Sequence, residues 1–235
     1  MGCRVVASEL IGFTEVVMNL EVFSDSVCPW CWIGKRRLEQ ALALPGCEDV
    51  TVTWRAFQLY PEIPAEGMDR DDFMRARFGS SGGRSEMWQR MEAEGEKEGI
   101  TFRFGAMKRM PNTLHAHRLE RWAHVVGGAE GQDRMVETLF ETHFVAGEDL
   151  GDKDVLAAAA GRAGFDEVEA RSWLDTDEGS REVLHEVQWS RENGITGVPC
   201  FVLPNGYGIP GAQDADTLAK LIRRGKALEA RAAAG

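Results

Sequence analysis

Two cysteines three positions apart are the residues best suited to chemistry, and they lie in the segment Cys28-Pro29-Trp30-Cys31. On the first turn of a helix, residues at i and i+3 lie about 5–6 Å apart in Cα, within the range that a disulfide can bridge. The free N–H groups and partial positive charge of a helix N-terminus stabilise a thiolate. Proline suits such a turn because its missing N–H would have no partner there. The motif predicts a thiol–disulfide redox pair, with Cys28 the more exposed thiol and Cys31 the more buried one.

Zinc sites use the same cysteine spacing, so a metal site is one alternative, but a structural zinc site needs a second pair of ligands. The remaining cysteines are isolated in the sequence, and no histidine has a partner pair of cysteines. We therefore expect no metal. A pair of inert, buried structural thiols is a further alternative. Of the isolated cysteines, Cys47 is expected at the surface and Cys200 as a buried structural thiol. His115 and His117 are expected as solvated or capping side chains of a helix.

A strand–helix–strand pattern surrounds the cysteine pair. Residues 19–24 read as a strand, and residues 32–44 have the apolar spacing of a helix that Pro45-Gly46 ends. Residues 50–57 alternate between apolar and polar side chains and predict a second strand. The first part of the chain is therefore expected to form a βαβ unit.

Strand signals vanish between about residues 61 and 176, where glycines separate amphipathic segments. The helices expected in this region are residues 69–78, 84–98, 112–126, 130–145, 152–163 and 166–174. A helix at 177–192, short strands at 199–203 and 207–209, and a last helix from Asp214 complete the chain. The predicted class is α/β, in which residues 18–61 and 177–235 form one domain, residues 62–176 form an inserted all-helical domain, and residues 1–17 form a disordered tail.

A second chemically suggestive segment is Gly197-Val198-Pro199, at the start of a late strand. Proline is favoured at the first residue of a strand and is the residue for which a cis peptide bond costs little. A cis Val198–Pro199 bond would leave the backbone of Val198 free to pair with an extended substrate. An ordinary trans proline that opens a strand fits the dipeptide equally well. Trp30 and Trp32 can present an apolar face to substrate, and one of them is expected to pack against the helical segment.

Composition limits the partners of the protein. The 235-residue chain has a formal net charge of −11. Such a chain repels nucleic-acid phosphates and anionic membrane surfaces, and its apolar runs fall short of the roughly 20 residues of a membrane helix. We therefore expect neither nucleic acid nor membrane among the partners. Five cysteines without a signal-peptide pattern indicate a reducing compartment, so a cytoplasmic location is expected. The oligomeric state is left open.

Together, these residues resemble the thioredoxin superfamily in its DsbA-like branch, where a helical domain is inserted into the thioredoxin fold. Among that branch the chain is similar to the FrnE group, which shares the pattern Phe-Ser-Asp-x-x-Cys-Pro-Trp-Cys-x-Ile-Gly-Lys-Arg, present here as residues 23–36. The resemblance runs from about residue 18 to 225. Its other matching segments are residues 109–113, 117–118, 149–152 and 194–199.

The resemblance implies a protein disulfide oxidoreductase or isomerase. In that activity Cys28 would be the attacking thiolate, Cys31 the resolving thiol and Pro199 a cis-proline facing them. Pro29 and Trp30 would tune the pair and, with Val198, contact substrate. No cofactor would be required beyond the redox-active Cys28–Cys31 disulfide, and the partners would be protein thiols and disulfides.

Glutathione-using relatives in the same branch imply an alternative. The 2-hydroxychromene-2-carboxylate isomerases and kappa-class glutathione transferases typically carry serine at the position of Cys28. They share the segment around Asn112 with this chain, which makes Asn112 a candidate substrate-binding residue. Glutathione therefore remains a possible co-substrate, and a glutathione-dependent small-molecule isomerase or transferase remains the alternative function.

Overall fold

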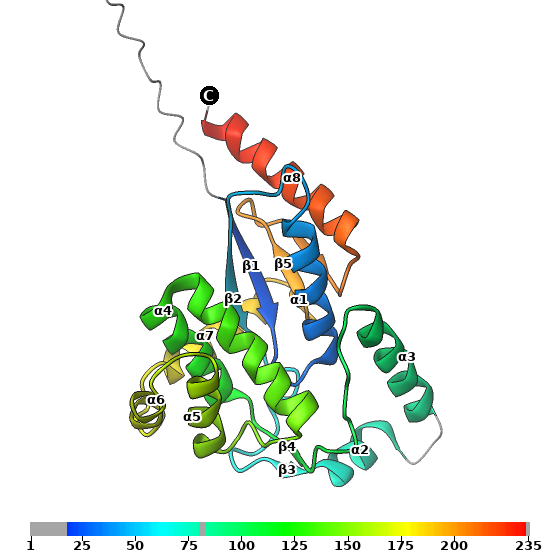
Figure 1. Cartoon of the computed structure of the whole chain (residues 1–235), viewed down its shortest axis with the longest axis vertical. Coiled ribbons are helices and arrows are strands. Elements are labelled where there is room, and N and C mark those ends of the chain that lie inside the picture. Colours follow the sequence, from blue (N-terminus) through cyan, green and yellow to red (C-terminus); the bar gives the residue numbers. More distant parts are fainter. Residues whose placement is uncertain (1–17, 80–82, 234–235) are drawn as a thin grey trace, which may run out of the picture.

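A computed structural model describes residues 18–79 and 83–233 of the chain (Figure 1). The expected tail at residues 1–17 lies outside the described residues. Four strands form the central sheet in the order β2-β1-β5-β6. The strands are β1 (Met18–Ser24), β2 (Val50–Ala56), β5 (Cys200–Val202) and β6 (Gly208–Pro210). Among the described residues, the model has no helix that combines the length and apolar character needed to span a membrane.

The register of the sheet brings two distant segments together. β1 pairs in parallel with β2 along its whole length, from Met18 opposite Val50 to Ser24 opposite Ala56. β5 runs antiparallel to β1, with Phe23 opposite Cys200. The residues that follow β1 therefore lie beside the residues that precede β5.

Helices cover the two faces and one edge of this sheet. α1 (Pro29–Leu42) and α8 (Ala215–Ala233) pack on the face that carries Leu20 and Val22. α7 (Ser180–Glu192) covers the opposite face, where Trp189 stacks on Phe23 with ring centroids 5.9 Å apart.

A side chain from a neighbouring helix covers part of the sheet edge that β2 forms. α4 (Leu114–Glu141) runs beside β2. Within α4, the Gln132 amide accepts a hydrogen bond from the Trp54 N–H at 3.0 Å and donates to the Trp54 carbonyl at 2.9 Å. These two bonds satisfy backbone groups of an edge strand that would otherwise invite pairing with another chain.

The segment between β2 and α7 is mainly helical, as predicted. A single helix, α4, covers most of the residues of the two helices expected at 112–126 and 130–145. Gly128 interrupts α4 with φ 65°, a conformation that glycine adopts without steric cost. The short antiparallel pair of β3 (Met68–Asp69) and β4 (Arg109–Met110) was not predicted, because two residues are too few to show alternation. The other elements here are α2 (Arg70–Phe78), α3 (Gly83–Lys97), the π-helix η1 (Thr142–Ala146), α5 (Lys153–Arg162) and α6 (Glu167–Leu174).

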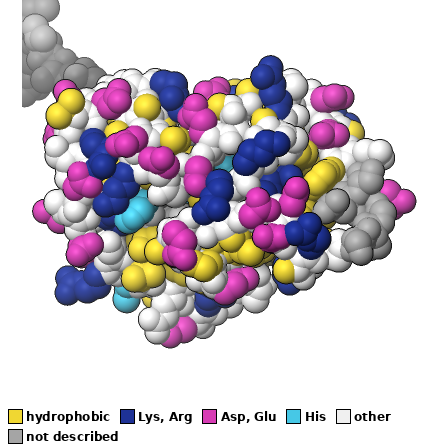
Figure 2. Space-filling view, turned by 90° about the horizontal axis from the view of Figure 1, so that it is seen from below, with side chains coloured by type: hydrophobic (Ala, Val, Ile, Leu, Met, Phe, Trp, Pro, Cys, Tyr) yellow, Lys and Arg dark blue, Asp and Glu magenta, His cyan; other side chains and the backbone are white. Residues whose placement is uncertain are grey.

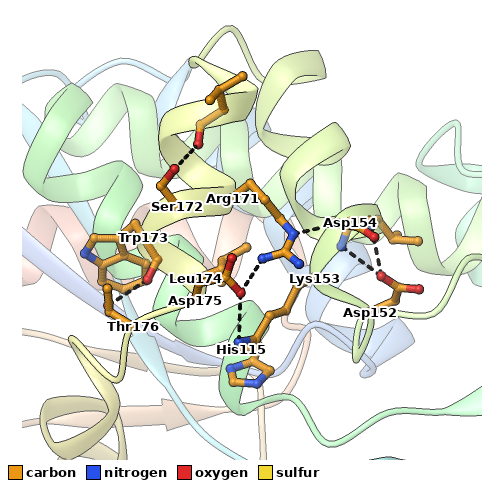
Figure 3. Close-up of polar contacts among 12 residues, drawn as sticks. His115, Asp152, Lys153, Asp154, Arg171, Ser172, Trp173, Leu174, Asp175 and Thr176 are labelled. Carbon is orange, nitrogen blue, oxygen red and sulfur yellow. Dashed lines mark hydrogen bonds and ion pairs between the residues drawn. The ribbon is translucent and has the colours of Figure 1, made fainter.

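Ion pairs on the surface connect α5 and α6 (Figure 3). The Arg171 guanidinium donates to Asp154 at 2.6 Å, and the Lys153 ammonium lies 3.4 Å from Asp175. Exposed pairs of this kind each contribute little, about 0–1 kcal/mol.

The predicted order of β-α-β, helical segment and α-β-β-α is confirmed. The division of the chain into domains at residues 61 and 177 stays a prediction.

Gly34 allows α1 to approach β5 closely. A Cβ atom at this position would lie 2.9 Å from Cγ of Pro199 and 3.4 Å from the ring of Phe201. Separations below 3.0 Å require the neighbour to move, and the proline ring is fixed in a buried segment. The missing side chain of Gly34 therefore sets how near the first turns of α1 lie to Pro199.

We expect Gly34→Ala to lower the free energy of unfolding. Overpacking costs about 1–3 kcal/mol, whereas the gain in helix propensity returns about 1 kcal/mol. Gly161→Ala in α5 is the matched control, because a Cβ there meets only the flexible side chain of Glu167. Urea denaturation of both variants measures the effect. Equal stabilisation of the two variants would show that Gly34 is not a close-packing constraint.

Candidate redox site

Cys28 is the residue at which α1 begins. It has extended backbone angles, with φ −97° and ψ 109°, and Pro29 follows as the first helical residue. The Cys28 N–H donates to the Asp25 carbonyl at 2.9 Å, and the Cys31 N–H donates to the Cys28 carbonyl at 3.0 Å. Cys28 thus lies at the N-terminus of the helix, where the positive end of the helix dipole favours a negative charge.

Val198 and Pro199 lie against this first turn. The Cys28 thiol donates to the Val198 carbonyl oxygen at 3.6 Å, and the Val198–Pro199 peptide bond is cis. The β1–β5 pairing produces this proximity, since Phe23 and Cys200 are register partners. The Val198-Pro199 dipeptide alone is equally compatible with a trans bond, and the observed cis geometry is the one that the family resemblance implies.

The thiols are more buried than the sequence suggested. Cys28 was expected to be the more exposed of the two, and the order is as predicted, but its relative exposure is only 4%, and that of Cys31 is 0%. Burial, a hydrogen bond to Cys28 and the nearby Cys28 charge raise the pKa of Cys31 well above its ordinary value. Cys47 was expected at the surface, and this was wrong: its thiol packs under α8 and contacts the Ala219 carbonyl at 3.7 Å. Cys200 is buried, as expected.

A buried charged cluster lies behind the cysteine pair. His117 was expected to be solvated or capping, but it is fully buried. Its Nδ1 lies 2.9 Å from a Glu120 carboxylate oxygen, and its Nε2 lies 2.9 Å from the Phe57 carbonyl and 3.5 Å from Asp25. Burial opposes the charged form of His117, but the carboxylates of Glu120 and Asp25 outweigh it and raise the pKa to about 10. The cluster therefore holds an imidazolium between two carboxyl groups at neutral pH.

Asp25 connects this cluster to the cysteine turn. One carboxylate oxygen accepts a hydrogen bond from the Leu59 N–H at 2.7 Å. The other is buried and makes no hydrogen bond within the described part of the chain. The backbone of Asp25 contacts both cysteines: its carbonyl accepts a hydrogen bond from the Cys28 N–H, and it is a hydrogen-bond partner of the Cys31 sulfur. In the sequence, Asp25 is a plausible helix cap and part of the family motif, but Cys28 is the N-cap of α1, and the buried partners of Asp25 lie elsewhere in the chain.

An apolar pocket of about 320 Å³ opens beside Cys28. One wall consists of Cys28, Pro29, Trp30 and Val198, so four predicted site residues meet here. The opposite wall comes from the helical segment and includes His143. Sequence reasoning found no role for His143, which burial keeps neutral by lowering its pKa to about 4.

Trp32 and Asn112 lie away from this pocket lining. Trp32 packs against Phe140 and Phe144, and its indole donates to Glu137 at 2.9 Å, which confirms that one tryptophan packs on the helical segment. The Asn112 amide donates to the Ile63 carbonyl at 2.7 Å, and its oxygen accepts hydrogen bonds from the Gln58 side-chain amide at 3.1 Å and the Leu114 N–H at 3.0 Å. The substrate contact of Asn112 stays a prediction. Within the described residues, no group of three or more potential ligands is arranged to hold a metal.

Comparison with known proteins assigns this arrangement to a family. A family model described as DSBA-like thioredoxin domain matches residues 19–223. The chain therefore belongs to the DSBA-like thioredoxin family, and its fold is the DsbA-like thioredoxin fold.

Individual relatives agree with this assignment. The chain is 28% identical over 211 residues to the uncharacterised protein YwbO of Bacillus subtilis, a match that covers 88% of this chain and 96% of that protein. The crystal structure of a probable DsbA oxidoreductase, SCO1869 from Streptomyces coelicolor, superposes with a TM-score of 0.78 at 28% identity, covering 88% and 89% of the two chains. A 2-hydroxychromene-2-carboxylate isomerase shares the fold, with a TM-score of 0.66 at 15% identity over 88% of this chain and 95% of that one.

The raised pKa of His117 predicts how stability depends on pH. The folded state retains the His117 proton up to about pH 10, whereas the unfolded state loses it near pH 6.5. Stability from this group is therefore fully present below pH 6.5 and is lost as the pH rises towards 10, by an amount on the order of a few kcal/mol. His117→Asn should be less stable at pH 6, and its free energy of unfolding should fall less steeply from pH 6.5 to 10. Urea titrations across this range measure the difference.

His185 is exposed, so His185→Asn supplies the control. The free energy of unfolding of this variant should change with pH as it does in the wild type. Parallel pH profiles of wild type and His117→Asn would contradict a charged His117.

Proposed function

We propose that this protein is a thiol–disulfide oxidoreductase of FrnE-like type that uses Cys28 and Cys31 as its redox pair. The observation that carries the proposal is the position of Cys28, which starts α1, contacts the Val198 carbonyl and lines the pocket beside it. Cys31 lies one helical turn behind and is fully buried. A substrate can therefore reach the Cys28 sulfur, while the Cys31 sulfur stays buried behind it and can resolve a mixed disulfide.

In the oxidising direction, a substrate thiolate attacks the Cys28 sulfur of a Cys28–Cys31 disulfide. The bond between the two cysteines breaks, a mixed disulfide forms at Cys28, and Cys31 leaves with the electron pair. The raised pKa of Cys31 means that the leaving thiolate takes up a proton. A second substrate thiolate then attacks the substrate sulfur of the mixed disulfide, releasing an oxidised substrate and a reduced Cys28.

The dithiol form runs the same steps in reverse. Cys28 lines the pocket that a substrate enters, whereas Cys31 is fully buried one turn behind it. Cys28 therefore attacks a substrate disulfide, and Cys31 resolves the mixed disulfide. No cofactor besides the cysteine pair enters these steps. The net direction depends on the reduction potential relative to the partner, where about 30 mV corresponds to about 1.4 kcal/mol.

Protein thiols and glutathione are both candidate partners, and a cytoplasmic location is proposed from the sparse, odd set of cysteines. The similarity in fold to 2-hydroxychromene-2-carboxylate isomerase keeps a glutathione-dependent isomerase or transferase as the alternative. The intact cysteine pair favours the redox function, because glutathione-dependent isomerisation requires no second cysteine.

Replacing each cysteine separately tests the proposal. Cys28→Ser should abolish the reduction of insulin by dithiothreitol that the protein catalyses, since serine cannot form the mixed disulfide. Cys31→Ser should accumulate that mixed disulfide, detectable by mass spectrometry, because no resolving thiol remains. Cys47→Ala should retain activity, as Cys47 lies under α8.

The outcome for Cys28→Ser separates the two functions. Loss of thiol exchange supports the oxidoreductase. Full retention of thiol exchange in Cys28→Ser would refute it, and an isomerase activity that survives this change would favour the glutathione-dependent alternative.

A further inference from the structure

The pocket beside Cys28 has an unusual lining. Five of the nine methionines of the chain contribute to it. Aromatic side chains, among them Phe73, Trp88 and Phe104, line it as well. The methionines are Met74, Met87, Met91, Met107 and Met110. Methionine side chains are flexible and polarizable, adapt to different apolar shapes and make favourable contacts with aromatic rings.

Charge is scarce in this lining. Among the described residues that line the pocket, Arg70 carries the only permanent charge, and its guanidinium lies 4.9 Å from the centroid of the Trp88 ring. The buried His143 is neutral at pH 7. A pocket of this composition favours the transfer of an apolar group from water and opposes the entry of groups that carry several charges.

The pocket also limits the size of what reaches Cys28. Its volume of about 320 Å³ is near the lower end of the range for ligand pockets, roughly 300–1,000 Å³. Cys28 is only 4% exposed, so most of its surface is covered, and the pocket is the space that opens beside its sulfur. Figure 2 views the molecule from the end of the sheet near which α1 begins and shows hydrophobic side chains gathered in a hollow between charged ones.

α3 forms one side of the pocket and is attached to α1 by specific contacts. Arg37 of α1 pairs with Glu94 and Glu98 of α3, each at 2.6 Å. The guanidinium of Arg90 lies 5.9 Å from the ring centroid of Trp30, one of the two residues between the cysteines. The wall opposite Cys28 is therefore held in place against the redox turn.

We propose that this pocket binds a low-molecular-weight thiol or disulfide whose sulfur carries an apolar, aromatic substituent. The proposal rests on the redox function proposed above. The substituent enters the methionine-lined cavity and places its sulfur at Cys28. Glutathione is a poor fit, because it has two carboxylates and an ammonium group to desolvate, whereas the described lining supplies a single cation.

The reaction that the pocket favours is the reduction of the Cys28–Cys31 disulfide by such a thiol. One apolar thiolate forms the mixed disulfide at Cys28, and a second thiolate releases the symmetric organic disulfide. Two thiols lose two electrons and two protons in total, and the cysteine pair gains them as two thiols.

A single-turnover experiment tests this preference. The oxidised full-length protein is mixed with 2-phenylethanethiol, 2-mercaptoethanol or glutathione, and the rate of disulfide loss is measured by acid quench and mass spectrometry. A disulfide-bonded peptide of residues 27–32 provides the reference, so that the protein-to-peptide rate ratio removes the intrinsic reactivity of each thiol. We expect this ratio to be about tenfold to a hundredfold larger for 2-phenylethanethiol than for 2-mercaptoethanol, from burial of the phenyl ring.

Variants locate the preference in the pocket. Met107→Gln and Met74→Gln each replace a lining thioether with an amide. In both variants the preference for 2-phenylethanethiol over 2-mercaptoethanol, measured by the rate ratios, should fall several-fold. Val125→Gln is the control, because Val125 is 74% exposed and lies outside the pocket, so its preference should equal that of wild type. If the methionine variants do not fold, inhibition of the wild-type protein tests the pocket instead. 2-Phenylethanol, which has no sulfur, should occupy the pocket and slow the attack of 2-mercaptoethanol on the wild-type protein.

Each outcome decides one question. Equal rate ratios for the three thiols would overturn the pocket proposal while the redox function stands, whereas failure of every thiol to reduce the protein would refute the redox function itself. A rate ratio for N-acetyl-Phe-Cys-amide above that for 2-phenylethanethiol would overturn the small-molecule assignment in favour of a peptide partner. The highest ratio for glutathione would overturn it in favour of glutathione.

Discussion

The close approach of α1 to the Val198–Pro199 segment is the contact on which the site depends. It joins residues about 170 positions apart, and two features make it possible. The pairing of β1 with β5 brings the segments side by side, and Gly34 leaves room for the ring of Pro199. Because the Cys28 thiol contacts the Val198 carbonyl at 3.6 Å, the position of the reactive sulfur is set by long-range packing as well as by the helix that it begins.

The two sides of the redox turn have opposite electrostatic character. Behind it, His117 is held in its charged form between Asp25 and Glu120, with all three groups buried. Removing one member of such a buried cluster leaves an uncompensated charge and is strongly destabilising. In front of it, thioether and aromatic side chains form a nearly uncharged pocket. The sulfur of Cys28 lies at the boundary of these regions, where an apolar substituent and a polar exchange reaction can both be accommodated.

Local pattern was sufficient to predict the cysteine turn and the strands beside it, because alternation and Pro45-Gly46 are encoded within short segments. It was insufficient wherever burial depends on a distant partner. Cys47 is covered by α8 across 172 residues of sequence, and Cys28 faces a wall formed by α2, α3 and the loop after them. His117 finds Phe57 60 positions away. The family resemblance supplied the cis geometry at Pro199, which the dipeptide alone left open.

An equilibrium redox titration tests the central claim most directly. The chain with Cys3, Cys47 and Cys200 replaced by alanine would be equilibrated in buffers of reduced and oxidised dithiothreitol, and its free thiols would then be trapped and mapped by mass spectrometry. The account predicts a single two-electron transition, with one intramolecular disulfide that joins Cys28 to Cys31. A chain whose two cysteines remain thiols at every buffer ratio would contradict it.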